Sequence, residues 1–142
     1  MARYSGGMVV AGAGTTLRPV LGLLSTAAIT ALMREIKLEN PTATACTYEV
    51  VRFTGGTAGA DVGEVDHRPD SPAASCLLKQ LWTADATIVE KTGDICYLPA
   101  GAAEVMTFGE SGLTTALGST AGIGVVPIGT GQLIIAKFAW DE

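Results

Sequence analysis

Charged side chains are scarce in this sequence: they make up 16% of its 142 residues, against about 25% in an average soluble protein. The formal net charge is −5, and lysine and arginine form no cluster anywhere in the chain. Because binding to a phosphate backbone needs grouped cations, we expect no direct contact with nucleic acid. A monomer with so few charges would expose much neutral, partly apolar surface, so we expect partners to cover some of it.

Histidine and cysteine are also rare. His67 is the single histidine, and the three cysteines, Cys46, Cys76 and Cys96, are odd in number and far apart in the chain. Their spacing matches no metal motif, and one disulfide would leave a free thiol. Free cysteine behaves as a small hydrophobe, so we expect buried, reduced thiols and assembly in a reducing cytoplasm.

Long apolar runs are missing. Residues 20–24 are too short and too interrupted by glycine to span a bilayer, and residues 1–7 lack the apolar core of a signal peptide. We therefore expect neither a membrane segment nor a targeting segment.

Small and apolar residues are abundant: 48% of the chain is hydrophobic and 18 residues are glycine. This composition excludes disorder and indicates a compact protein with many tight turns. Strand-like segments follow one another with turn signals about every 8–12 residues, which is typical of a sandwich or barrel. We predict an all-β fold, an antiparallel β-sandwich, with residues 1–142 forming a single domain.

A strand, a turn and a strand are expected at the centre of the sequence. Residues 32–39 mostly alternate between apolar and polar, with Met33 and Arg34 as exceptions, which favours a half-buried strand. Residues 40–43 carry turn chemistry, and residues 46–54 are rich in β-branched and aromatic side chains. We predict that these two strands form a hairpin.

A helix remains an alternative for the first of these strands, because the apolar residues of segment 29–38 also lie at helical spacing.

Two further turns are predicted. Residues 123–128 and 132–140 flank Gly129-Thr130-Gly131, the clearest hairpin pattern in the sequence. A turn at Gly93-Asp94 divides residues 86–98 into two strands.

The N-terminal segment has two interpretations. Residues 1–14 are rich in glycine and alanine and contain a short apolar stretch, Met8-Val9-Val10. They fit either a first edge strand or an arm that orders only against a partner.

Residues 55–72 are predicted to form a long surface loop with a short strand around residues 62–65.

That loop holds the candidate chemistry. His67 is flanked by carboxylates and fits either a general base or metal ligand, or a solvated loop residue; the pattern favours the loop residue. Asp61, Glu64, Asp66 and Asp70 could bind calcium in principle, but they do not follow the EF-hand spacing.

No other motif carries a reaction. Gly12-Ala13-Gly14 and Gly122-Ile123-Gly124 lack the full spacing of phosphate-binding loops, so turns or close packing explain them better. Trp82 and Trp140 have apolar neighbours and are expected to be core or interface anchors rather than ligand platforms. We assign no catalytic, cofactor-binding or metal-binding residue and expect a non-enzymatic protein.

Several stretches together resemble small virion proteins of tailed bacteriophages, especially those that infect actinobacteria. The resemblance is spread over most of the chain and does not depend on a single diagnostic motif. It lies in Ala2-Arg3-Tyr4-Ser5, Arg34-Glu35-Ile36, Asn40, Thr42-Ala43-Thr44-Ala45, Val50-Val51-Arg52-Phe53-Thr54, Thr83-Ala84-Asp85-Ala86-Thr87, Gly129-Thr130-Gly131-Gln132 and Phe138-Ala139-Trp140-Asp141-Glu142.

The resemblance implies a capsid decoration protein, also called a cement or minor capsid protein. It implies a jelly-roll-like β-sandwich that binds the outside of the major capsid protein lattice as a homotrimer, and therefore a location on the virion surface. Cys46, Cys96 and the acidic loop depart from that pattern.

Two other classes remain open. One is a tail- or fibre-associated structural module that binds carbohydrate, which clustered exposed aromatic side chains would favour. The other is a cupin-type enzyme on a jelly-roll scaffold, which needs several histidine ligands and is disfavoured by a single histidine.

Overall fold

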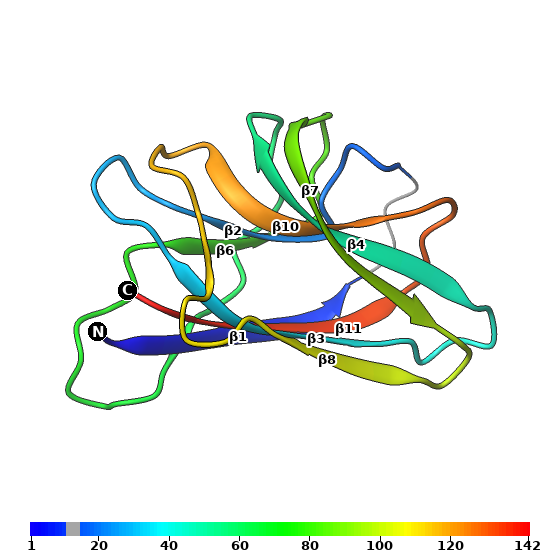
Figure 1. Cartoon of the computed structure of the whole chain (residues 1–142), viewed down its shortest axis with the longest axis horizontal. Helices are drawn as coiled ribbons and strands as arrows, with labels where there is room; N and C mark the ends of the chain where they lie inside the picture. The colour runs from blue at the N-terminus through cyan, green and yellow to red at the C-terminus, as the bar shows by residue number, and fades with distance from the viewer. Residues whose placement is uncertain (11–14) are drawn as a thin grey trace.

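Two antiparallel sheets pack face to face in the computed structural model, which describes residues 1–10 and 15–142 (Figure 1). Sheet A contains, in spatial order, β5 (Val65–Asp66), β1 (Arg3–Val10), β11 (Ile134–Asp141), β3 (Leu32–Glu39) and β8 (Ala103–Thr107), with β9 (Leu113–Thr114) also paired to β3. Sheet B contains β6 (Leu77–Gln80), β2 (Leu21–Leu24), β10 (Ala121–Pro127), β4 (Cys46–Thr54) and β7 (Thr87–Leu98).

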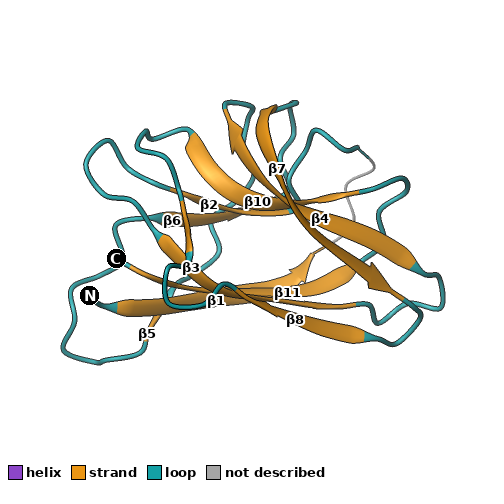
Figure 2. Cartoon of the chain, viewed as in Figure 1, coloured by secondary structure: helices purple, strands orange, loops and turns teal. Residues whose placement is uncertain are grey.

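The described residues are strands, turns and loops (Figure 2). They include no helix long and apolar enough to cross a membrane. The predicted antiparallel β-sandwich is therefore confirmed, and residues 32–39 are the strand β3 rather than the alternative helix.

The strand order is that of a jelly roll. Without the short β5, β6 and β9, the sheets read β1-β11-β3-β8 and β2-β10-β4-β7. Of these eight strands, β4 and β7 are the one pair consecutive in the chain that lies in a single sheet. Every other connection crosses between the sheets, which gives the two interlocked Greek keys of a jelly roll.

Both predicted hairpins are therefore wrong. β3 and β4 lie in opposite sheets, and so do β10 and β11.

Buried polar side chains form hydrogen bonds at the two connections that cross between the sheets. Asn40 is fully buried, and its Nδ2 donates to the carbonyls of Thr44 and Leu98 at 2.8 and 3.2 Å. The Tyr48 hydroxyl donates to the Gln132 carbonyl at 2.7 Å and accepts from the Gln132 N–H at 3.1 Å. These contacts satisfy loop backbone groups that a hairpin ladder would otherwise have satisfied.

A β-bulge explains the two exceptions in the alternation of β3. Trp140 pairs with Met33 and Ala139 with Glu35, so Arg34 is an extra residue in β3. The extra residue shifts the alternation by one position, and both Met33 and Ile36 are fully buried.

Residues 3–10 form a strand of this sandwich and not an arm: β1 pairs with β11 over its whole length and with β5 at Tyr4 and Ser5. The other expectations placed in this region, an arm that extends to residue 14 and the Gly12-Ala13-Gly14 turn, concern residues 11–14, which lie outside the described residues.

The turn predicted at Gly93-Asp94 is also wrong. β7 continues through both residues, and its register with β4 shifts between Glu49 and Val51. Gly93 takes a φ of 84° there, and the Thr92 hydroxyl donates to the Val50 carbonyl at 3.0 Å. The glycine thus allows a bulge in a continuous edge strand rather than a chain reversal.

The main core fills the space between the sheets and includes the fully buried side chains of Trp140, Tyr48 and Phe138. A second core lies on the outer face of sheet B. Neighbouring residues of β4 belong to different cores: Val50 to the main one, and Val51 and Phe53 to the second. Since side chains alternate along a strand, the second core lies on the side opposite the first.

Three glycines make room for the second core. Gly22, Gly122 and Gly124 are neighbours on β2 and β10, where Gly124 pairs with Gly22. A Cβ at Gly22 would lie 2.8 Å from the Trp82 ring and 3.1 Å from the Phe53 ring. The two rings meet edge to face with centroids 5.1 Å apart. The glycine pair Gly122-Ile123-Gly124 is thus explained by close packing, as expected.

Candidate functional site

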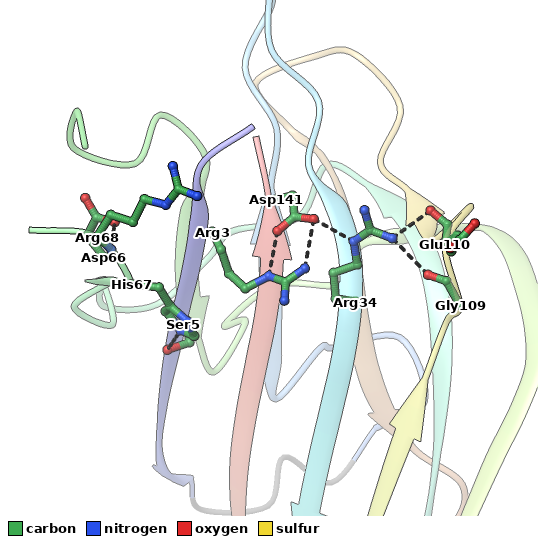
Figure 3. A network of polar contacts seen from close by, with 9 residues as sticks. All are labelled: Arg3, Ser5, Arg34, Asp66, His67, Arg68, Gly109, Glu110 and Asp141. Carbon is green, nitrogen blue, oxygen red and sulfur yellow. Dashed lines mark hydrogen bonds and ion pairs between the residues drawn. The ribbon is translucent and has the colours of Figure 1, made fainter. Parts of the chain in front are cut away.

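One end of the outer face of sheet A carries a network of ionic contacts (Figure 3). Asp141 on β11 is the register partner of Arg3 on β1. Its Oδ1 accepts from Arg3 Nε at 2.8 Å, and its Oδ2 accepts from Arg3 Nη2 at 3.2 Å and Arg34 Nε at 2.6 Å. The bulge of β3 places Arg34 beside this carboxylate, whose side chain is only 8% exposed.

The two guanidinium groups hold the pKa of Asp141 below its usual value, chiefly through the hydrogen bond from Arg3. Asp141 raises the pKa of Arg3 in return. Arg34 also donates through Nη1 to the carbonyls of Gly109 and Glu110, at 2.9 and 2.6 Å. The network therefore fixes the loop after β8 to the sheet.

The C-terminal residues hold a second loop. The Glu142 carboxylate accepts hydrogen bonds from the backbone N–H groups of Ser75 and Cys76 at 2.8 and 3.0 Å, and from Trp140 Nε1 at 3.0 Å. The Tyr4 hydroxyl donates to the Pro72 carbonyl at 2.8 Å. These groups too are engaged in holding the backbone.

His67 lies exposed in the predicted loop, with its Nε2 3.0 Å from the Ser5 hydroxyl. A surface cavity of about 330 Å³ lies beside it, lined by Met1, Arg3, His67, Arg68 and Asp141. Figure 3 shows His67 directed toward Ser5 and away from Asp141, so the structure does not join the histidine to a carboxylate as a catalytic pair.

Three of the four acidic side chains of this loop have separate partners. Asp61 forms an ion pair with Lys79 at 2.6 Å, Glu64 accepts from the Leu78 N–H at 3.1 Å, and Asp66 accepts from the Arg68 N–H at 2.8 Å. Within residues 1–10 and 15–142, no three potential ligands lie close enough together to hold a metal ion. The short strand of the loop is β5, at Val65–Asp66 rather than at residues 62–65.

The cysteines are buried and free, as predicted. Burial raises the pKa of the Cys76 and Cys96 thiols to about 12. The Cys96 thiol also donates to Glu104 Oε2 at 3.1 Å, which favours its protonated form. Trp82 and Trp140 are buried as well, so they are core side chains rather than ligand platforms.

The outer face of sheet A away from the network is here called the open face; the residues discussed on it are Gly7, Val9, Lys37, Val65, Ile135 and Lys137. A groove of about 520 Å³ lies over β1 and β11, with Gly7 and Val9 on one side and Ile135 and Lys137 on the other. Lys137 is the register partner of Lys37, and both are exposed.

Exposed apolar side chains lie on the two edge strands at one side of the sandwich, here called the apolar edge: Val89, Ile95 and Tyr97 of β7 and Val105 of β8, which are 50–66% exposed. Ile95 and Tyr97 alternate with buried Cys96 and Leu98 and so lie on the outer face of sheet B, whereas Val105 pairs with exposed Lys37 on the outer face of sheet A. Of the strands described, β4 alone pairs with β7 and β3 alone pairs with β8.

The sequence analysis missed both surfaces. Period-two alternation placed Lys37 on the polar side of its strand, but only the register of β3 with β11 brings Lys137 opposite it. No protein-family model, curated protein or solved structure matches this chain.

Proposed function

We propose that this protein is a non-enzymatic virion structural protein that binds the outside of a bacteriophage capsid lattice and stabilises the head, as a trimer. The observation that carries the proposal is the apolar edge. Val89, Ile95, Tyr97 and Val105 are large apolar side chains held half-exposed or more on regular strands. Such surfaces mark contacts with other proteins.

Two features support a structural role. The jelly roll is a fold that viral capsid domains use, although it also serves lectins and cupins. Two polar clusters, Asp141 with its two arginines and Glu142 with its three donors, hold loops in place. A stiff domain with apolar contact surfaces suits a lattice, where a trimer engages several equivalent sites and gains avidity from modest contacts.

Quantitative mass spectrometry of purified virions tests the proposal. Hundreds of copies per particle support capsid decoration, and absence from the virion contradicts it. Sedimentation of the purified chain tests the trimer: a monomer of 14.5 kDa at micromolar concentration would show that the chain does not trimerise by itself. Replacing Ile95 and Tyr97 by serine should weaken the trimer if the apolar edge is its interface.

The alternative is a tail- or fibre-associated module that binds carbohydrate. Tyr97 is 62% exposed, more than any other tyrosine, phenylalanine or tryptophan of the described residues. One ring is a small platform, and it lies on a strand rather than beside the acidic loop. A copy number of a few per virion would favour this alternative.

A further inference from the structure

One edge of β1 is partly free. The Arg3 carbonyl accepts the His67 N–H at 3.0 Å, which shows which way its backbone groups point. Backbone groups of alternate residues point to the same edge, so those of Gly7 and Val9 point to the β5 side too. β5 ends its pairing at Ser5, and the backbone groups of Gly7 and Val9 have no partner on that side among the described residues.

An apolar groove lies beside this free edge. Gly7 has no side chain, and Met8, Val9, Val65 and Ile135 surround the space of about 520 Å³. Val9 and Val65 are 52% and 61% exposed. A strand placed along β1 in line with β5 would therefore gain backbone hydrogen bonds and a place for an apolar side chain.

Two lysine side chains lie next to the groove. Lys37 and Lys137 face each other across β3 and β11, an arrangement that destabilises a sheet when nothing neutralises it. Glu35 and Glu39 flank Lys37 on the same face of β3, yet no ion pair forms between them and either lysine. Lys137 lines the groove itself. A carboxylate on a strand added beside β1 would lie two strand spacings, about 10 Å, from β11, within reach of the long side chain of Lys137.

We propose that the open face binds an extended segment of a partner protein that adds as a strand to β1 at Gly7 and Val9. Its apolar side chain fills the groove, and a carboxylate of the same segment contacts Lys137. The inference rests on this face alone and holds whether or not the partner belongs to a capsid.

The test uses the full chain, labelled with ¹⁵N, and two blocked nine-residue peptides of alternating valine and threonine. One peptide carries a central aspartate, and its match carries lysine instead. The aspartate peptide should shift the Gly7 and Val9 amide signals and slow their hydrogen exchange by about tenfold at saturation. The lysine peptide should bind more weakly. Absence of binding, equal binding of both peptides, or shifts centred on β7 would each overturn the proposal.

Two pairs of variants sharpen the result. Val9→Pro removes the N–H that would donate to the added strand, and proline is tolerated on an edge; Val9→Thr has a similar shape and keeps the N–H. Binding should be lost in V9P and kept in V9T. Lys137→Gln should weaken binding of the aspartate peptide about two- to fivefold, whereas Lys37→Gln, one strand farther away, should change it little. Arg18→Gln, which removes one cation from an exposed pair with Asp85, should not weaken it. If V9P does not fold, the Lys137→Gln variant decides: unchanged affinity would refute the carboxylate contact.

Discussion

The two outer faces of the sandwich differ. On sheet B, Trp82 and Phe53 lie in a second core and are 3% and 1% exposed. On sheet A, Val9 is 52% exposed, and two unpaired lysines lie nearby. The difference comes from connectivity. The long connection from β4 to β7 returns over sheet B with Ala58, Trp82 and Ala86, whereas no such segment of the described residues covers the centre of sheet A. The covered face therefore adds stability, and the open face remains available for binding.

Removing the central side chain of the second core should have the largest effect on stability. Trp82→Ala deletes the centre of the second core, and we expect a loss of about 3–5 kcal/mol in the free energy of unfolding. Val9→Ala on the open face should cost less than about 0.5 kcal/mol. Urea denaturation followed by tryptophan fluorescence for V9A, and by circular dichroism for W82A, measures both. Similar losses would show that the two faces do not differ in this way.

The glycines that make room for the second core on the outer face of sheet B provide the next test. Gly22→Ala would place a methyl group against the Trp82 and Phe53 rings, and overpacking of this kind costs about 1–3 kcal/mol. Gly63→Ala is the matched control, because a Cβ there would meet nothing within 4 Å. Thermal unfolding of the two variants should separate them. Equal midpoints would show that the rings move aside without cost.

The ionic network on sheet A should give a smaller, pH-dependent effect. Asp141→Asn weakens the charged contacts with Arg3 and Arg34, and we expect a loss of about 1–2 kcal/mol at pH 7, because Arg3 is half-exposed. The folded-state pKa of Asp141 is depressed. Its stabilisation is therefore fully present above the unfolded pKa and lost as the pH falls through the folded pKa.

The difference between wild type and D141N should thus shrink below about pH 4. Denaturation curves at pH 7 and pH 3 measure it, and a constant difference would show that the charge of Asp141 is not the cause.

The smallest effect should come from His67→Ala. The ring is exposed and loses only its contact with Ser5, so stability should change by less than about 0.5 kcal/mol. A larger loss, measured by thermal unfolding, would show that this corner of sheet A is packed more tightly than the open face beside it.

Strands could be predicted from the sequence, but their partners could not. Alternation identified residues 32–39 as a strand because its signal is local, and the succession of short strands and turns identified the antiparallel β-sandwich. The two hairpins failed because a six-residue connection such as residues 128–133 can reverse within one sheet or cross to the other. The crossing is held by contacts with residues far away in the sequence, such as the hydrogen bonds between Tyr48 and Gln132.

The same limit applies to the surfaces. Arg34 and Met33 broke the expected alternation because of a bulge, and a bulge is a property of the pairing of two strands. Gly93 indicated a turn on composition alone, although β4 keeps β7 extended there. The lysine pair of the open face arises from register in the same way. Composition did predict correctly that the cysteines are buried, because burial of a thiol needs no particular partner.

The position of β10 and β11 has a consequence for how the chain folds. They are the last strands in the chain, yet β10 lies between β2 and β4 and β11 lies between β1 and β3. During synthesis, neither sheet can close before residues 121–141 have left the ribosome. Until then β1, β2, β3 and β4 have no neighbours in their own sheets except those at the outer edges. Folding should therefore wait for these residues and be slow, since the pairings that complete both sheets join strands far apart in the sequence.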